Sequence, residues 1–155
     1  SEHPNLRLTA TDISQQAITL AQQNCADLKL SNVQFQVSNL FEALTGTYTM
    51  IVSNPPYIAS GDCRTLMPDV RDYEPMLALD GGSDGLDFYR EIIRQSPTFL
   101  AEDVHLLLEI GYDQADAVKS LIEKHADLIW ISCHQDLAGN DRVVHAQRVQ
   151  NTSLN

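Results

Sequence analysis

The chain has 155 residues, about the size of one domain, and its 43% apolar and 20% charged residues suffice for a folded core. Acidic residues outnumber basic ones by 21 to 10, a net charge of -11. Affinity for nucleic acid depends largely on Lys and Arg that neutralise phosphates. The sequence shows no local basic patch, so no direct binding of nucleic acid is expected.

The sequence also argues against a membrane protein and against a disulfide-rich protein. No apolar run approaches the roughly 18–20 residues that span a bilayer, and the N-terminus lacks the pattern of a signal peptide. The three cysteines are widely spaced and form no CxxC pair, which argues against a disulfide framework and a zinc site. We therefore expect a cytoplasmic protein with no membrane and no metal.

Hydrophobic periodicity predicts strands that alternate with helices. The predicted helices cover 15–28 after a Ser14 cap, about 86–99 after an Asp84 cap, and a segment to about 124 after an Asp113 cap. The stretch 39–44 reads as one short helical turn and 58–82 as a long irregular segment. The predicted strands cover 6–10, 33–37, 48–53, 104–110, 128–133 and 142–148.

This alternation predicts an α/β sheet with helices on both faces. The last two strands have no helix between them and are expected to be antiparallel. Residues 1–149 are predicted to form one partial catalytic domain, and 150–155 a disordered tail.

Polar residues follow the first two predicted strands, where α/β sheets bind ligands. Asp12 is placed to accept both hydroxyls of a ribose, although it could equally begin the next helix. Asn39 could meet the edge of a nucleobase and Leu40 could cover its face. A helix cap and a core leucine are the alternatives for these two residues.

Asn54-Pro55-Pro56-Tyr57 directly follows the third strand. The two prolines fix the backbone, so the last carbonyls point outward instead of into a ladder. The Asn54 side-chain oxygen and the Pro55 carbonyl can hold both N–H bonds of a planar NH2 group, and Tyr57 can pack flat on it. Such a grip would aim the nitrogen lone pair at an electrophile. It requires Asn54 and Tyr57 to remain outside the packed core.

At this tetrapeptide the sequence resembles class I S-adenosylmethionine-dependent methyltransferases, whose amino-methylating members carry [N/D]PP[Y/F]. More narrowly, it resembles the HemK/PrmC family of protein-(glutamine-N5) methyltransferases, which modify the Gly-Gly-Gln motif of bacterial peptide-chain release factors. The motif alone is shared with adenine-N6 methyltransferases, so the other stretches favour the glutamine enzymes. These stretches are 11–14, 52–58, 71–75, 82–89, 107–114 and 136–144.

The resemblance implies a class I, Rossmann-like fold and S-adenosylmethionine as cofactor. It implies that Asp12 binds the cofactor ribose, that Asn39 and Leu40 lie by the adenine, and that Asn54 touches cofactor and substrate. Residues 54–57 (Asn, Pro, Pro, Tyr) would hold the glutamine amide, with Asn54, Pro55 and Tyr57 as the catalytic set. The family commonly has Asp at the position of Asn39, so the adenine contact would lack a charge here.

Other polar residues are weaker candidates. Glu74 could order the long segment or meet the substrate, and Glu109 ends a buried strand where a structural role is equally plausible. Arg142 is expected to pair with a carboxylate. His105 and His134 are expected to be structural. Transfer of a methyl group from a sulfonium needs no obvious general base, since the proton can pass to water.

The family's glycine-rich loop after a first strand does not appear in this sequence, nor does the family's helical N-terminal domain. We therefore expect a C-terminal fragment that lacks the central first strand and binds cofactor weakly. The competing functions are glutamine methylation of a ribosomal protein, adenine-N6 methylation of nucleic acid, and a catalytically incompetent fragment.

Overall fold

The computed structural model describes residues 6–71 and 73–149, so the predicted tail at 150–155 lies outside the described residues. The chain divides into two compact units, Ser1–Gly46 and Thr47–Asn155. Their strands form two separate sheets, one of two strands and one of four. The sequence predicts a sheet that lacks its central first strand, and each unit, with its own sheet, is described by itself.

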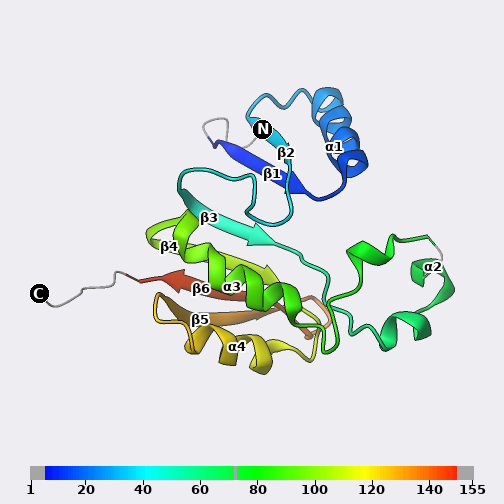
Figure 1. Cartoon of the computed structure of the whole chain (residues 1–155), viewed down its shortest axis with the longest axis vertical. Coiled ribbons are helices and arrows are strands. Elements are labelled where there is room, and N and C mark those ends of the chain that lie inside the picture. Colours follow the sequence, from blue (N-terminus) through cyan, green and yellow to red (C-terminus); the bar gives the residue numbers. More distant parts are fainter. Residues whose placement is uncertain (1–5, 72, 150–155) are drawn as a thin grey trace, which may run out of the picture. The chain divides into compact units, whose positions relative to one another are not determined.

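The first unit is a β-α-β crossover. Strand β1 (Leu8–Asp12) pairs in parallel with β2 (Val33–Val37), and helix α1 (Gln15–Asp27) connects them and packs on both strands (Figure 1). The Ser14 hydroxyl caps α1 by accepting from the Ala17 backbone N–H at 3.2 Å, as predicted. Strand β1 begins two residues later than expected.

The second unit contains a mixed sheet in the order β3-β4-β6-β5. Strand β3 (Tyr48–Ser53) is parallel to β4 (Leu100–Glu109). Strand β6 (Asp141–Arg148) runs antiparallel to both β4 and β5 (Leu128–Gln135), which confirms the predicted direction of the last two strands. The parallel pair places the end of β3 beside the end of β4.

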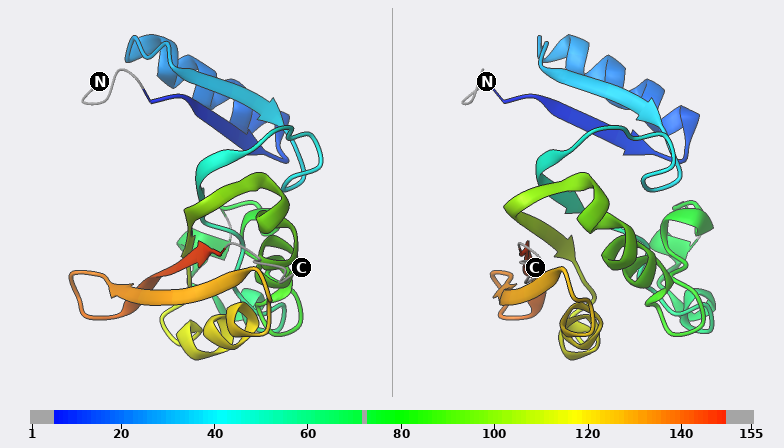
Figure 2. Two further views of the ribbon diagram at one scale, coloured as in Figure 1. Left: turned by 90° about the vertical axis from the view of Figure 1, so that its left-hand side faces the viewer. Right: turned by 60° about the vertical axis from the view of Figure 1, so that its left-hand side comes forward.

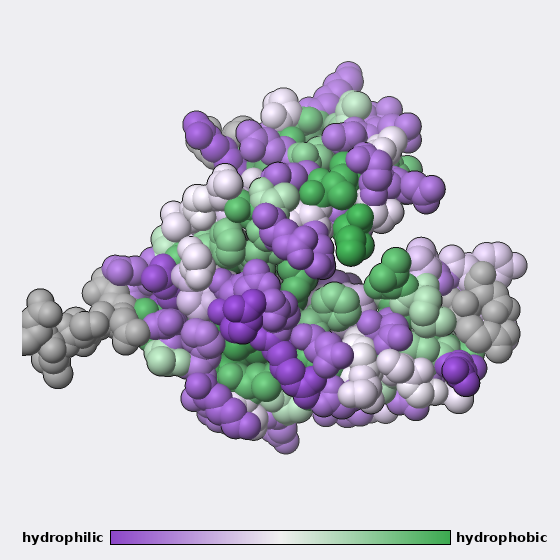
Figure 3. All heavy atoms as spheres, in the orientation of Figure 1, coloured by the Kyte–Doolittle hydropathy of each residue, from purple (hydrophilic) through white to green (hydrophobic). Residues whose placement is uncertain are grey.

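Helices α3 (Asp87–Phe99) and α4 (Ala115–Glu123) contact one another and pack on this sheet (Figure 2). Helical spacing predicts that Tyr89, Ile92, Ile93 and Ser96 of α3 face inward, and all four are buried. Figure 3 shows mainly hydrophilic residues on the outer surface of α3, as its amphipathic pattern requires. The buried residues of this unit include Tyr89, Ile92, Ile93, Ser96, Leu106, Leu108, Val118, Ile122, Val144 and Ala146.

Two predicted helix caps are wrong. Helix α3 begins at Asp87, directly after Leu86. The Asp84 carboxylate lies in the turn before the helix, where it accepts from the Leu86 N–H and pairs with Arg90. Helix α4 begins after Gln114, with no side-chain cap from Asp113. Carboxylates near a helix start also bond within the preceding turn, so their presence does not fix the first helical residue.

The segment from 58 to 82 was predicted to be irregular, but it holds three short helical turns. They are η1 (Asp62–Thr65), α2 (Pro68–Arg71) and η2 (Met76–Ala78) (Figure 1). The two ends of the segment are joined by backbone hydrogen bonds, from Ile58 N to Leu79 O at 3.0 Å and from Gly81 N to Ile58 O at 2.8 Å. The segment is therefore closed at its base, directly after the diproline sequence.

Within the described residues, no helix is long and apolar enough to cross a membrane.

Candidate functional site

In the first unit, Asp12 lies at the carboxyl end of β1 and its side chain is exposed. The backbone N–H of Ser38, which follows β2, donates to the Asp12 carbonyl at 3.0 Å. The parallel pairing thus brings Asp12 to the same edge as Ser38, Asn39 and Leu40. The Asp12 Oδ1 atom accepts from the Ser14 N–H at 2.7 Å, but Ser14 itself is the helix cap.

The turn after β2 is held by Ser38, a residue that the sequence reasoning missed. The buried Ser38 hydroxyl donates to the Leu40 carbonyl at 2.9 Å and accepts from the Ala43 N–H at 3.0 Å. Leu40 has a φ of 49°, a left-handed conformation that is unfavourable for a leucine. Strained residues of this kind gather at ligand sites, where neighbouring contacts enforce them. The sequence feature that could have identified Ser38 is its position directly before the predicted turn at 39–44, where a hydroxyl can bond to the backbone.

Asn39 is exposed, and its side-chain N–H donates to Glu42 Oε1 at 2.9 Å. An asparagine amide has two N–H donors and an acceptor oxygen, so this one bond leaves capacity for a ligand. Leu40 is half-buried beside it. The alternative prediction, that Leu40 is a core residue, therefore agrees only in part with its half-buried position.

In the second unit, β3 ends at Ser53 and the tetrapeptide Asn54-Pro55-Pro56-Tyr57 follows it. Asn54 is exposed, Pro55 is buried, and Pro56 and Tyr57 are half-buried. The side chains predicted to hold a planar NH2 group thus remain outside the packed core. Pro55 forms the buried side of the corner.

The backbone of this corner packs directly against glycines. A Cβ atom at Gly81 would lie 2.8 Å from the Pro56 carbonyl oxygen and 2.8 Å from the Tyr57 Cα. One at Gly85 would lie 2.4 Å from the Tyr57 carbonyl oxygen, and Gly85 also has a φ of +73°. Both positions require glycine, because any side chain there would displace the corner.

Tyr89 lies fully buried near the corner, and its hydroxyl donates to the Glu109 carbonyl at 2.8 Å. Burial raises the pKa of the Tyr89 hydroxyl well above its ordinary value, and Tyr57 and Glu109 add to the shift. The hydroxyl therefore stays protonated and acts as a donor. Glu109 ends β4, where its carbonyl has a structural role, while the side chain of Glu74 is exposed.

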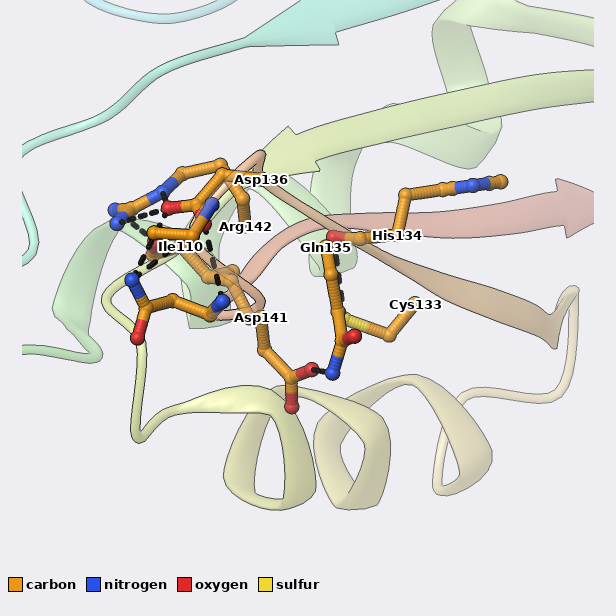
Figure 4. Close-up of polar contacts among 9 residues, drawn as sticks. Ile110, Cys133, His134, Gln135, Asp136, Asp141 and Arg142 are labelled. Carbon is orange, nitrogen blue, oxygen red and sulfur yellow. Dashed lines mark hydrogen bonds and ion pairs between the residues drawn. The ribbon is translucent and has the colours of Figure 1, made fainter.

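Arg142 pairs with Asp136 at 3.2 Å and donates to the Ile110 carbonyl at 3.2 Å, which joins the β5–β6 hairpin to the end of β4 (Figure 4). The hydrogen bond to Asp136 raises the pKa of the guanidinium, and Tyr57 and Glu109 also contribute. The expectation that Arg142 pairs with a carboxylate is confirmed. Among the described residues, no three His, Cys, Asp or Glu side chains are grouped to hold a metal ion.

Residues 1–68 match the methyltransferase small domain family. The chain is 43% identical to the release factor glutamine methyltransferase of Fusobacterium nucleatum, over 91% of this chain and 40% of that protein. It is also 43% identical to that of Pseudomonas aeruginosa, over 95% of this chain and 53% of that protein. The chain belongs to the release factor glutamine methyltransferase family. It spans about half the length, or less, of these curated relatives.

Solved structures with low sequence identity share the fold. A methyltransferase from Pyrococcus furiosus matches 93% of this chain and 63% of its own with a TM-score of 0.67 and 17% identity. The ribosomal protein L11 methylase from Lactobacillus delbrueckii subsp. bulgaricus matches 93% of this chain and 58% of its own, with a TM-score of 0.65 and 18% identity. The predicted class I methyltransferase fold is confirmed.

Proposed function

We propose that the protein transfers a methyl group from S-adenosylmethionine to the side-chain amide nitrogen of the glutamine in the Gly-Gly-Gln motif of bacterial peptide-chain release factors. The observation that carries the proposal is the diproline corner after β3, with Asn54 exposed and Pro55 buried. The names of the similar proteins support the same substrate.

Residues of the first unit fit an adenosyl group. The exposed Asp12 carboxylate uses one oxygen toward Ser14 and has further acceptor capacity for the two ribose hydroxyls. Asn39 offers amide groups to a base edge, and the half-buried Leu40 offers an apolar surface to its face. S-adenosylmethionine would supply an electrophilic methyl group on a positively charged sulfur.

The corner would hold the glutamine amide. Its two N–H bonds donate to the Asn54 side-chain oxygen and the Pro55 carbonyl, while Pro56 and Tyr57 line the planar group. Such a grip would direct the nitrogen lone pair at the methyl carbon, so that an N–C bond would form as the donor's C–S bond breaks. The nitrogen would then carry a positive charge and lose its proton to water. The chain's residues thus orient the amide and need not act as a general base.

Tritiated methyl transfer tests the proposal. The protein is offered a release factor, the same factor with its Gly-Gly-Gln glutamine replaced by alanine, a ribosomal protein and DNA. We expect incorporation only into the unchanged release factor, and loss of at least about 100-fold in kcat for Asn54→Ala, because orientation of the reacting amide depends on it. Incorporation into the ribosomal protein or DNA alone would contradict the proposed substrate.

A further inference from the structure

Gln114 lies directly after the turn that follows β4 and precedes the first residue of α4. Its side chain does not cap the helix. Instead, its Nε2 atom donates to the Tyr57 carbonyl at 2.9 Å, between residues 57 positions apart in the sequence. The end of the diproline corner is therefore tied to the start of α4.

The same amide group makes three further hydrogen bonds. Its Nε2 atom donates to the Gly85 carbonyl at 3.3 Å. Its Oε1 atom accepts from the Gly111 N–H at 3.0 Å and from the Tyr89 hydroxyl at 3.5 Å. The amide orientation is fixed by this pattern, since exchanging its oxygen and nitrogen would set the oxygen against two carbonyls. Three separate turns thus meet at one side chain.

Few side chains can replace this amide. Glutamate offers no donor when ionised, and lysine offers no acceptor. Asparagine carries the same amide on a side chain that is shorter by one methylene. The glycines at 81, 85 and 111 leave the space that the arrangement needs, because a Cβ at Gly85 would lie 2.7 Å from Gln114 Nε2 and one at Gly111 would lie 3.0 Å from Oε1.

We infer that Gln114 is a positioning residue that holds the Asn54-Pro55-Pro56-Tyr57 corner in the geometry that grips the substrate amide. The inference rests on the proposed function for its kinetic consequences. The prolines restrict φ at two positions, and the planar peptide group that joins Tyr57 to Ile58 is held at both of its polar atoms. Gln114 donates to its carbonyl, and its N–H donates to the Leu79 carbonyl.

The first experiment measures methyl transfer by three variants of the whole protein. Gln114→Leu removes all four side-chain hydrogen bonds, and we expect kcat to fall about 10- to 100-fold while KM for S-adenosylmethionine changes less than about 3-fold. Gln95→Leu is the matched control, a half-buried glutamine of α3 that bonds to Glu91. It should leave both constants unchanged. A kcat of Gln114→Leu within 2-fold of the unchanged protein overturns the inference.

Gln114→Glu provides a pH-dependent readout. The introduced carboxyl donates only when protonated, and the two carbonyl oxygens beside it favour that form. Relative to the unchanged protein, its kcat should therefore rise as the pH is lowered from 8 to 6, whereas the relative kcat of Gln114→Leu should not. A flat ratio for Gln114→Glu contradicts a role as donor to Tyr57, even if Gln114→Leu fails to fold.

Hydrogen exchange separates this inference from the proposed substrate. The Ile58 N–H should exchange at least about 10-fold faster in Gln114→Leu than in Gln95→Leu, because the carbonyl before it is released. Unchanged exchange at Ile58 overturns the inference whatever the substrate is. Faster exchange in a protein that methylates no Gly-Gly-Gln glutamine upholds the positioning role and rejects only the proposed function.

Discussion

Gly81 and Pro56 approach so closely that a Cβ atom on the glycine would lie 2.8 Å from the proline carbonyl oxygen. Both partners are backbone positions, so neither can move aside as a flexible side chain would. This contact fixes one side of the corner to which we assign the substrate amide. It also makes Gly81 the most direct test of how tightly that corner must be held.

Gly81→Ala should lower the free energy of unfolding by about 1–3 kcal/mol, the usual cost of overpacking, and reduce kcat of methyl transfer. Gly61→Ala is the control, since nothing lies within 4 Å of a Cβ at that position. Urea denaturation and the methyl-transfer assay would measure both effects. Equal stability and equal kcat in the two variants would contradict the close packing of the corner.

Asp12→Asn tests the cofactor assignment. The amide oxygen preserves an acceptor for the Ser14 N–H, while the charge and the second carboxylate oxygen are lost. A hydrogen bond to a charged group contributes about 1.5–3 kcal/mol, so KM for S-adenosylmethionine should rise about 10-fold or more with little change in Tm. Asp62→Asn, at an exposed position of η1, should leave KM unchanged. An unaltered KM in Asp12→Asn would remove the ribose contact from the proposal.

Tyr89→Phe removes the buried hydroxyl that donates to the Glu109 carbonyl at 2.8 Å and leaves the ring packing intact. We expect a loss of about 1 kcal/mol in the free energy of unfolding, the typical net value of one hydrogen bond. Tyr73→Phe, at a tyrosine that is 85% exposed, should have no measurable effect. Denaturation midpoints that coincide for the two variants would show that the buried bond contributes nothing.

His145 gives a prediction about pH. Burial lowers the pKa of its imidazole, and the neighbouring His105 and His134 lower it further; His105 Nδ1 lies 2.9 Å from His145 Nε2. In the unfolded chain this imidazole therefore takes up a proton near its ordinary pKa of about 6.5, whereas in the folded chain it does so only at a lower pH. Its contribution to the free energy of unfolding is fully present above pH 6.5 and is lost as the pH falls toward the lower pKa of the folded chain.

Unfolding free energies at pH 7.5, 6.5 and 5.5 would measure this dependence. His145→Gln cannot take up the proton, so its stability should fall less than that of the unchanged protein between pH 6.5 and 5.5. Other titrating groups contribute to both proteins and cancel in the comparison. A steeper fall in His145→Gln would show that the sign of the shift is wrong.

Local patterns predicted several elements closely. The sequence pattern predicted the bounds of β2 and β3, and the helical spacing in α3 identified four of its five buried residues. Strand β4 begins at Leu100, earlier than predicted, because Tyr48 pairs with Leu100 across the sheet. That pairing depends on a distant segment and leaves no periodic signal in 100–103.

The sequence by itself determined where the reactive corner lies, because two successive prolines stop a strand and fix the backbone wherever they occur. It also determined that Asp12 and Asn39 share one edge, since both follow strands joined by a helix. Only the tertiary structure decided what holds the corner in place. Gln114 and the glycines reach it from segments far along the chain, and hydrogen bonds and close contacts of that range depend on folding instead of local spacing.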